Sequence, residues 1–159
     1  MLWMRNYLIQ CRAVGEHTGE ALTVLEFTVA PNDGSPVHIH QNEDETYYVL
    51  EGTFVIQVGT NVYELNPGGC VFGPRGVTHA FLNAGSELGK LLVIATPAGM
   101  ERYHQEAGTT ADARILPPQT IALNAQLAAT LAHKYRFEVV GPPLRVDGAR
   151  PSNGMKDEV

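Results

Sequence analysis

The sequence predicts an all-β protein with a barrel or sandwich fold. Between residues 21 and 96, eight or more short segments rich in β-branched and aromatic residues follow one another. Turns that contain Gly, Pro or Asn separate these segments, as at residues 31–34 and 66–69. No long helical pattern interrupts the series, which excludes the alternating strands and helices of a parallel α/β sheet.

The first thirty residues are predicted to form two extended segments separated by a turn at residues 15–20. Residues 1–12 are expected to form one extended arm, suited to pairing with a sheet edge in the same subunit or in a partner. In the segment 21–30, Leu25, Phe27 and Val29 alternate with polar residues. This alternation predicts a strand with one apolar face.

The pattern changes from strand to helix after Pro97. Residues 99–107 predict a helix, in which four residues share one face: Met100, Tyr103, His104 and Ala107. Asn124 is a suitable N-cap for a second helix over residues 125–135. Both helices are expected to lie on the outside of the barrel.

The domain organisation follows from these segments. We expect one domain over residues 1–146, with a barrel core at about 21–97 and a helical extension at about 99–136. Residues 147–159 contain few apolar side chains and are predicted to form a flexible tail.

Composition limits the class of function. Eleven Lys and Arg residues stand against 17 Asp and Glu residues, which gives a net charge of −6 and argues against a nucleic-acid partner. No apolar stretch is long enough to cross a membrane and no secretory signal is apparent, so we expect a cytoplasmic protein without a membrane partner. Cys11 and Cys70 fit no zinc-binding spacing and are expected to be small buried residues.

Three histidines and one glutamate form the candidate site. His38 and His40 stand two residues apart in a strand pattern, so both imidazoles point to the same face. Glu45 follows five residues later, and His79 lies on a separate predicted strand. If the two strands are neighbours, these side chains converge on one point, and nitrogen with oxygen ligands suits a divalent transition metal.

Two other acidic residues compete with Glu45 as the carboxylate ligand. Glu43 and Asp44 directly precede it, but the parity of the following strand favours Glu45. The two competitors are expected to lie at a solvated corner.

The spacing of these residues resembles the two motifs of the cupin family. The first motif is matched by His38, His40, Glu45 and Gly52, although Gly34 lies closer to His38 than the family pattern requires. The second motif is matched in full by Gly68, Pro74, Gly76, His79 and Asn83. The resemblance implies a double-stranded β-helix (cupin or jelly-roll) barrel with a metal bound by His38, His40, Glu45 and His79.

The resemblance also implies a function. The chain looks like the quercetin 2,3-dioxygenase-like cupins, which implies a metal-dependent dioxygenase acting on a small aromatic or enolisable substrate. Fe2+ is the favoured ion, with Ni2+, Mn2+, Zn2+ and Cu2+ left open. Two alternatives stay open: a metal-dependent isomerase, epimerase or lyase, and a non-catalytic binding or sensing protein. A homodimer joined through strand edges is expected.

Several further residues are candidates for contact with substrate. Glu45 and Tyr47 share one strand face, so Tyr47 is expected either to donate a hydrogen bond to substrate or to line the barrel. Phe81 is expected to form a pocket wall. Arg75, in a turn near the mouth, either meets a substrate carboxylate or is a surface residue. His104 could cap the opening, but a surface position is favoured.

Overall fold

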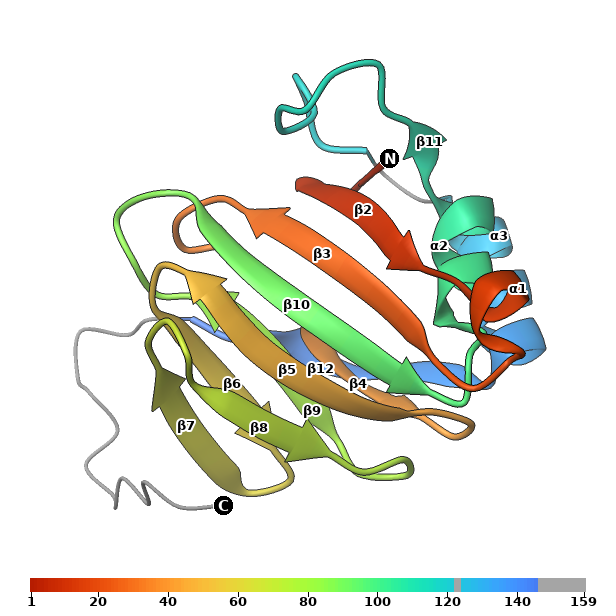
Figure 1. Ribbon diagram of the computed structural model, residues 1–159, viewed down its shortest axis with the longest axis horizontal. Helices are drawn as coiled ribbons and strands as arrows, with labels where there is room; N and C mark the ends of the chain where they lie inside the picture. The colour runs from red at the N-terminus through yellow and green to blue at the C-terminus, as the bar shows by residue number, and fades with distance from the viewer. Residues whose placement is uncertain (122–123, 146–159) are drawn as a thin grey trace.

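The described residues form a barrel of two sheets that face each other. The computed structural model describes residues 1–121 and 124–145. One sheet has seven strands in the order β11-β1-β2-β3-β10-β5-β8, and the other has five in the order β12-β4-β9-β6-β7 (Figure 1). All strand pairings in this part of the chain are antiparallel.

The elements are short, as the sequence predicts. The seven-stranded sheet contains β11 (Thr109–Thr110), β1 (Leu2–Met4), β2 (Tyr7–Ala13), β3 (Thr23–Val29), β10 (Gly89–Thr96), β5 (Asp44–Glu51) and β8 (Cys70–Gly73). The five-stranded sheet contains β12 (Phe137–Pro143), β4 (Pro36–His40), β9 (His79–Asn83), β6 (Phe54–Val58) and β7 (Asn61–Leu65). The helices are α1 (Gly15–Thr18), α2 (Met100–Ala107) and α3 (Ala125–Tyr135). The predicted all-β barrel with short C-terminal helices is confirmed.

The core is built from side chains that alternate along neighbouring strands. Leu91 of β10 lies opposite Phe27 of β3 on one side and Val49 of β5 on the other. Val93, two residues later, lies opposite Leu25. All five side chains are buried, and burial of each contributes about 1.5–3 kcal/mol. These side chains form one core with Phe54, Ile56 and Phe81 of the five-stranded sheet, which holds the two sheets together.

The N-terminal residues form a hairpin and not the single extended arm that we expected. Met4 of β1 pairs with Tyr7 of β2, and Arg5 and Asn6 make the turn between them. β2 then pairs with β3 of the same chain. The sheets therefore extend beyond the expected barrel core at 21–97, because β1 and β2 precede it and β12 follows it.

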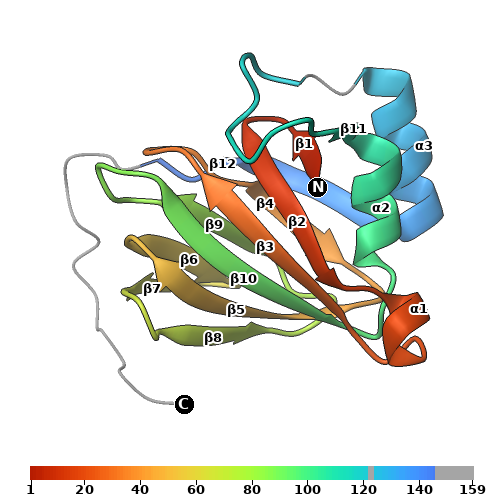
Figure 2. The ribbon, with the colours of Figure 1, turned by 45° about the horizontal axis from the view of Figure 1, so that its top comes forward.

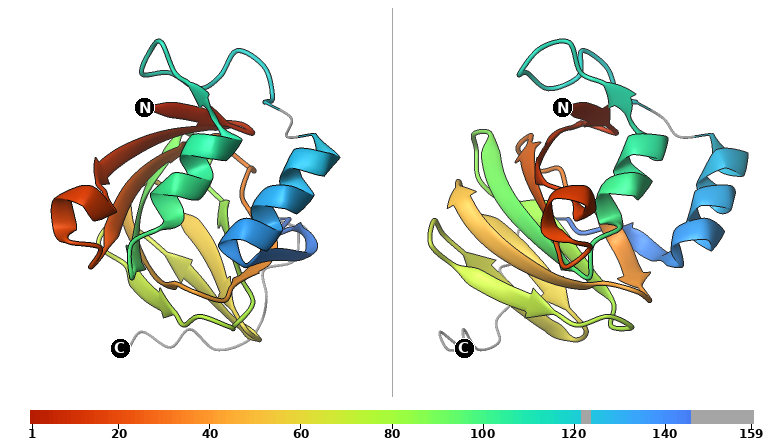
Figure 3. Two further views of the ribbon diagram at one scale, coloured as in Figure 1. Left: turned by 90° about the vertical axis from the view of Figure 1, so that its right-hand side faces the viewer. Right: turned by 45° about the vertical axis from the view of Figure 1, so that its right-hand side comes forward.

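The helices lie at one end of the barrel. α2 and α3 run beside each other over this end (Figure 3), and the β1–β2 hairpin lies close to α2 (Figure 2). The predicted N-cap of α3 is confirmed, because the Asn124 side chain accepts a hydrogen bond from the Leu127 backbone N–H at 2.8 Å. Among the described residues, none of the helices has the length and apolar character needed to cross a membrane.

Three expectations concern the surface of the domain. Cys70 is exposed on the edge strand β8, which corrects the expectation that it is buried, since β8 has a neighbour on one side. The expected homodimer through strand edges stays a prediction. The tail predicted at residues 147–159 lies outside the described residues.

Candidate metal centre

The structure brings together the four side chains that the two sequence motifs supply. His38 and His40 lie on β4, His79 lies on the adjacent strand β9, and Glu45 reaches them from β5 in the opposite sheet. One ligand atom of each residue lies within 4.8 Å of the corresponding atoms of the other three, and all four side chains are buried. Alternation along β4 turns both of its imidazoles to the barrel interior while Ile39 points away.

Backbone carbonyls fix the orientation of two imidazoles. His38 Nδ1 lies 2.8 Å from the Pro36 carbonyl oxygen, and His79 Nδ1 lies 2.9 Å from that of Val77. A carbonyl oxygen can only accept, so each Nδ1 carries the hydrogen and each Nε2 presents a lone pair. His79 Nε2 is buried without a hydrogen-bond partner among the described residues. A metal ion at this point would satisfy it.

Burial and ion pairing set the charge of the cluster. Burial lowers the pKa of His38 to about 3 and also lowers the pKa of His79, so both rings are neutral at pH 7. Burial alone would lower the pKa of His40, but the carboxylates of Glu45 and Glu43 raise it to about 9. His40 Nε2 lies 3.1 Å from Glu45 Oε1. A divalent cation would displace this proton, because it needs a neutral imidazole and attracts the same carboxylate.

The donor set therefore fits a divalent transition metal. Three imidazole nitrogens and one carboxylate oxygen would leave a net charge near +1 with a divalent ion and keep coordination positions free for a ligand. Mixed nitrogen and oxygen ligation of this kind suits Fe2+, Mn2+, Ni2+, Cu2+ or Zn2+.

Tyr47 supports the carboxylate of Glu45. Its hydroxyl donates a hydrogen bond to Glu45 Oε2, and burial with the adjacent carboxylate raises the pKa of this phenol. Tyr47 lines the cavity above the cluster, as does Phe81, the expected pocket wall. Val49, two residues further along β5, lies in the apolar core.

Glu43 and Asp44 differ from each other in position and in role. Glu43 is buried, which corrects the expectation of a solvated corner, and its Oε2 lies 3.6 Å from His40 Nδ1. The turn into α2 covers it, since a Cβ on Gly99 would lie 3.2 Å from Glu43 Oε1. Asp44 instead forms an ion pair with Arg75 at 2.7 Å on the surface. Arg75 is not among the residues that line the cavity described below.

Asn83 and Gly34 contribute to the framework. The Asn83 side chain is fully buried, donates to the carbonyls of Val29 and Glu87, and accepts from Gly85 N–H. Gly34 packs directly on β9, because a Cβ at this position would lie 2.0 Å from the Phe81 carbonyl oxygen. Gly34 therefore meets a steric requirement although its motif spacing is unusual.

His104 is buried beside the candidate site, which corrects the expectation of a surface group. Its Nδ1 lies 2.9 Å from the Met100 carbonyl oxygen, so the hydrogen is on Nδ1 and Nε2 is an acceptor. Phe27 and Tyr103 pack edge-on against the ring at centroid distances of 5.5 and 5.2 Å. The position of His104 in the apolar stripe of its helix was the signal for burial.

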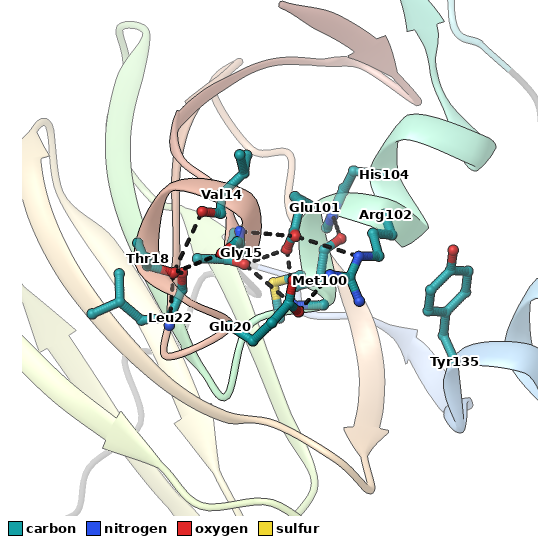
Figure 4. A network of polar contacts seen from close by, with 12 residues as sticks. Val14, Gly15, Thr18, Glu20, Leu22, Met100, Glu101, Arg102, His104 and Tyr135 are labelled. Carbon is teal, nitrogen blue, oxygen red and sulfur yellow. Dashed lines mark hydrogen bonds and ion pairs between the residues drawn. The ribbon is translucent and has the colours of Figure 1, made fainter.

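Glu101 fixes the helix that carries His104. Its buried carboxylate accepts a hydrogen bond from the backbone N–H of Gly15 at 3.1 Å (Figure 4). It also accepts from the backbone N–H of Gly99 at 2.9 Å and from the Thr23 hydroxyl. Burial alone would raise the pKa of Glu101, but these hydrogen bonds lower it. The ionised carboxylate therefore links the start of α2 to α1 and β3.

A cavity of about 600 Å³ connects the cluster with the N-terminal hairpin and the helices. Its walls are mainly apolar, and Phe137 of β12 packs against the rings of His38 and His40 at centroid distances of 5.1 Å. The sequence did not point to Arg5, Tyr7 and Tyr103, which also line the cavity. These residues lie far from the two motifs in the sequence, so no local pattern indicated that they line the cavity.

Comparison with known proteins agrees with this architecture. Residues 25–95 match the family model described as a cupin domain. This part of the barrel is therefore similar to a cupin domain. An uncharacterized protein of Streptomyces coelicolor is 34% identical over 55 residues, which are 35% of this chain and 52% of that relative. The match thus spans about half the length of the relative.

Solved structures share the fold of this barrel. A protein from Thermus thermophilus has 28% identity and a TM-score of 0.53, with 58% of this chain and 84% of that chain covered. An RmlC-like cupin from Shewanella frigidimarina has 20% identity and a TM-score of 0.56, with 64% and 87% covered. These similarities confirm the predicted double-stranded β-helix.

Proposed function

We propose that this cupin domain is a metal-dependent dioxygenase that acts on a small aromatic or enolisable compound. The observation that carries the proposal is the convergence of the four potential ligands, of which His38, His40 and Glu45 line a largely apolar cavity. His38, His40, Glu45 and His79 would hold one divalent ion, with Fe2+ favoured. When bound, the ion supplies Lewis acidity and redox chemistry towards an anionic oxygen and O2.

The residues around the cluster would prepare it and exclude water. Tyr47 holds the Glu45 carboxylate, and the buried Glu43 lies beside Nδ1 of His40, so both act as positioning residues. Phe81 and Phe137 line the cavity with apolar surface. A flat aromatic or enolic substrate fits such walls, because its ring packs against the aromatic side chains. Such a substrate has few polar groups, so few hydrogen-bond partners are needed in the cavity.

His104 is the candidate acceptor for the proton of a substrate hydroxyl. Burial lowers its pKa to about 4, which keeps the ring neutral at pH 7. Its Nδ1 is occupied by the Met100 carbonyl, so Nε2 is the nitrogen available to accept. Removal of this proton would leave the anionic oxygen that a cationic centre attracts.

Oxygen uptake tests the proposed activity. Protein loaded with Fe2+ or Ni2+ should consume O2 with at least one member of a panel of flavonols, diketones and catechols, and metal-free protein should not. His38→Ala should abolish the uptake, whereas the exposed His17→Ala should retain it. A fully metal-loaded protein that consumes no O2 with any of these compounds would contradict the proposal.

A metal-dependent isomerase, epimerase or lyase is the second candidate function, and His104 favours it. Such chemistry needs a base beside the Lewis acid, and a neutral imidazole in the same cavity supplies one. Incorporation of solvent deuterium into an enolisable ketone without O2 consumption would support this candidate over the dioxygenase. A protein that binds ligand but shows neither reaction would be a binding or sensing cupin.

A further inference from the structure

The cavity has a charged residue at a distance from the metal cluster. The turn of the β1–β2 hairpin forms part of the wall, with Met4, Arg5, Asn6 and Tyr7 all lining the cavity. Among the described residues that line the cavity, Arg5 is the one arginine or lysine, and the candidate ligand Glu45 is the one acidic residue. A cation therefore faces a space that is otherwise mainly apolar.

Arg5 has no acidic partner in the part of the chain that the structure describes. Arg12 and Arg75 each form an ion pair with a carboxylate at 2.7 Å, and Arg102 pairs with Glu20. None of the ion pairs in the described residues includes Arg5. The Arg5 residue is half-buried, so its charge is less screened than one in open water. A guanidinium without an acidic partner at such a position can bind a carboxylate from outside the chain.

The positive charge of Arg5 affects the pKa values of two tyrosines that line the cavity. Burial raises the pKa of Tyr7 and of Tyr103, and in both cases the positive charge of Arg5 opposes the shift. Tyr7 lies on β2 and Tyr103 on α2, and both line the cavity. The guanidinium charge therefore lies near two residues of the cavity wall, one on β2 and one on α2.

The backbone of Arg5 is held in a conformation that its side chain disfavours. Its φ is 54°, in the left-handed region that Gly or Asn usually occupies in a two-residue hairpin turn. The Ile121 backbone N–H donates to the Arg5 carbonyl at 2.9 Å, which ties the turn to the segment before α3. Turn geometry therefore does not explain an arginine here, and the position of Arg5 in the cavity wall distinguishes it from Arg136, which also has a positive φ.

We propose that Arg5 binds a carboxylate of the substrate, so that the compound held in this cavity is a carboxylic acid as well as an aromatic or enolisable molecule. This inference rests on the proposed function, since the opposite end of the compound would be the oxygen directed to the metal cluster. The Arg5 guanidinium would pair with the carboxylate in a bidentate arrangement, and the apolar walls would contact the body between the two ends.

A matched pair of probes tests the proposal. Affinities of 3,4-dihydroxybenzoate and its methyl ester are measured by calorimetry, with the metal-loaded and the metal-free protein. We expect the acid to bind the wild type about tenfold to a hundredfold more tightly than the ester, as for a charge-assisted pair. Arg5→Gly should remove this preference by weakening the acid and leaving the ester unchanged.

The variant and its control separate binding from folding. Gly suits the positive φ, so Arg5→Gly should fold with unchanged or higher thermal stability. Arg136→Gly makes the same substitution at another positive-φ arginine, with φ 51°, which is exposed and outside the cavity lining. It should keep the full preference for the acid.

The outcomes distinguish this proposal from the proposed activity. If the acid binds no better than the ester in wild type, or if Arg5→Gly retains the preference, Arg5 is not the carboxylate site. A preference that survives Arg5→Gly but disappears on metal removal would place the carboxylate on the ion and would also overturn the inference. An acid preference that depends on Arg5 in a protein without O2 uptake would support the carboxylate site while contradicting the dioxygenase.

Discussion

His38 of β4 lies directly opposite His79 of β9 in the five-stranded sheet, with ring centroids 4.4 Å apart. The two residues are 41 positions apart in the sequence, and this single register makes them neighbours. Each ring is already oriented by a hydrogen bond from Nδ1 to a carbonyl two residues earlier. The cluster is therefore arranged by the sheet before any ion binds.

Replacement of His38 tests whether the cluster binds metal. His38→Ala removes one of three imidazoles, so we expect its metal content after dialysis to fall to a small fraction of that of the wild type. The measurement is elemental analysis of protein loaded with one equivalent of Fe2+ or Zn2+. The exposed His17→Ala is the control and should keep full occupancy. Equal metal content in the two variants would contradict the assignment.

The two buried glutamates should differ in their effect on metal affinity. Glu43→Gln should weaken binding about 10- to 100-fold, because it disturbs the partner of His40 and leaves the four ligands in place. Glu45→Gln should weaken it more, since it removes the charged ligand. Competition with a chromophoric chelator measures both constants. The reverse order would mean that Glu43 is the carboxylate ligand.

His104 should contribute to the loss of stability in acid. Its pKa is lowered from 6.5 to about 4 in the folded state by burial, so below pH 6.5 the unfolded chain binds a proton that the native state does not. Stability from His104 is present above pH 6.5 and is lost between pH 6.5 and about 4, by about 3 kcal/mol in total.

The pH dependence of the free energy of unfolding isolates the contribution of His104. Urea unfolding of metal-free wild type and His104→Gln is compared at several values between pH 7 and 4. His38 and His79, whose pKa values are also lowered, and the His40 and Glu45 pair titrate in both proteins. The difference between the two slopes therefore belongs to His104. Equal slopes for the wild type and His104→Gln would show that the pKa of His104 is the same in the native and the unfolded state.

Glu101 should stabilise the domain and hold α2 in place. Glu101→Ala leaves the N–H groups of Gly15 and Gly99 without their acceptor, and we expect a loss of about 2–4 kcal/mol in the free energy of unfolding. Chemical denaturation measures it, with the exposed Glu16→Ala as a control expected within about 0.5 kcal/mol of wild type. A change as small as that of the control would show that α2 docks without this carboxylate.

The sequence alone determined the strands, their apolar faces and the four potential ligands. These features depend on local rules, since alternation in β4 directs His38 and His40 to one side and Asn124 caps the helix that follows it. The same rules fail where the chain turns. Arg5 in a positive-φ turn could not be distinguished from a continued strand, so the hairpin was missed.

The tertiary structure decided which polar residues join the cavity. Glu43 was expected in solvent and His104 on a surface, but the turn at Gly99 covers the first and the Glu101 hydrogen bonds direct the second inward. Arg5 reaches the same cavity because β2 pairs with β3 and its turn contacts the segment before α3. These contacts join residues far apart in the chain, and burial depends on what packs against a side chain more than on its neighbours in sequence.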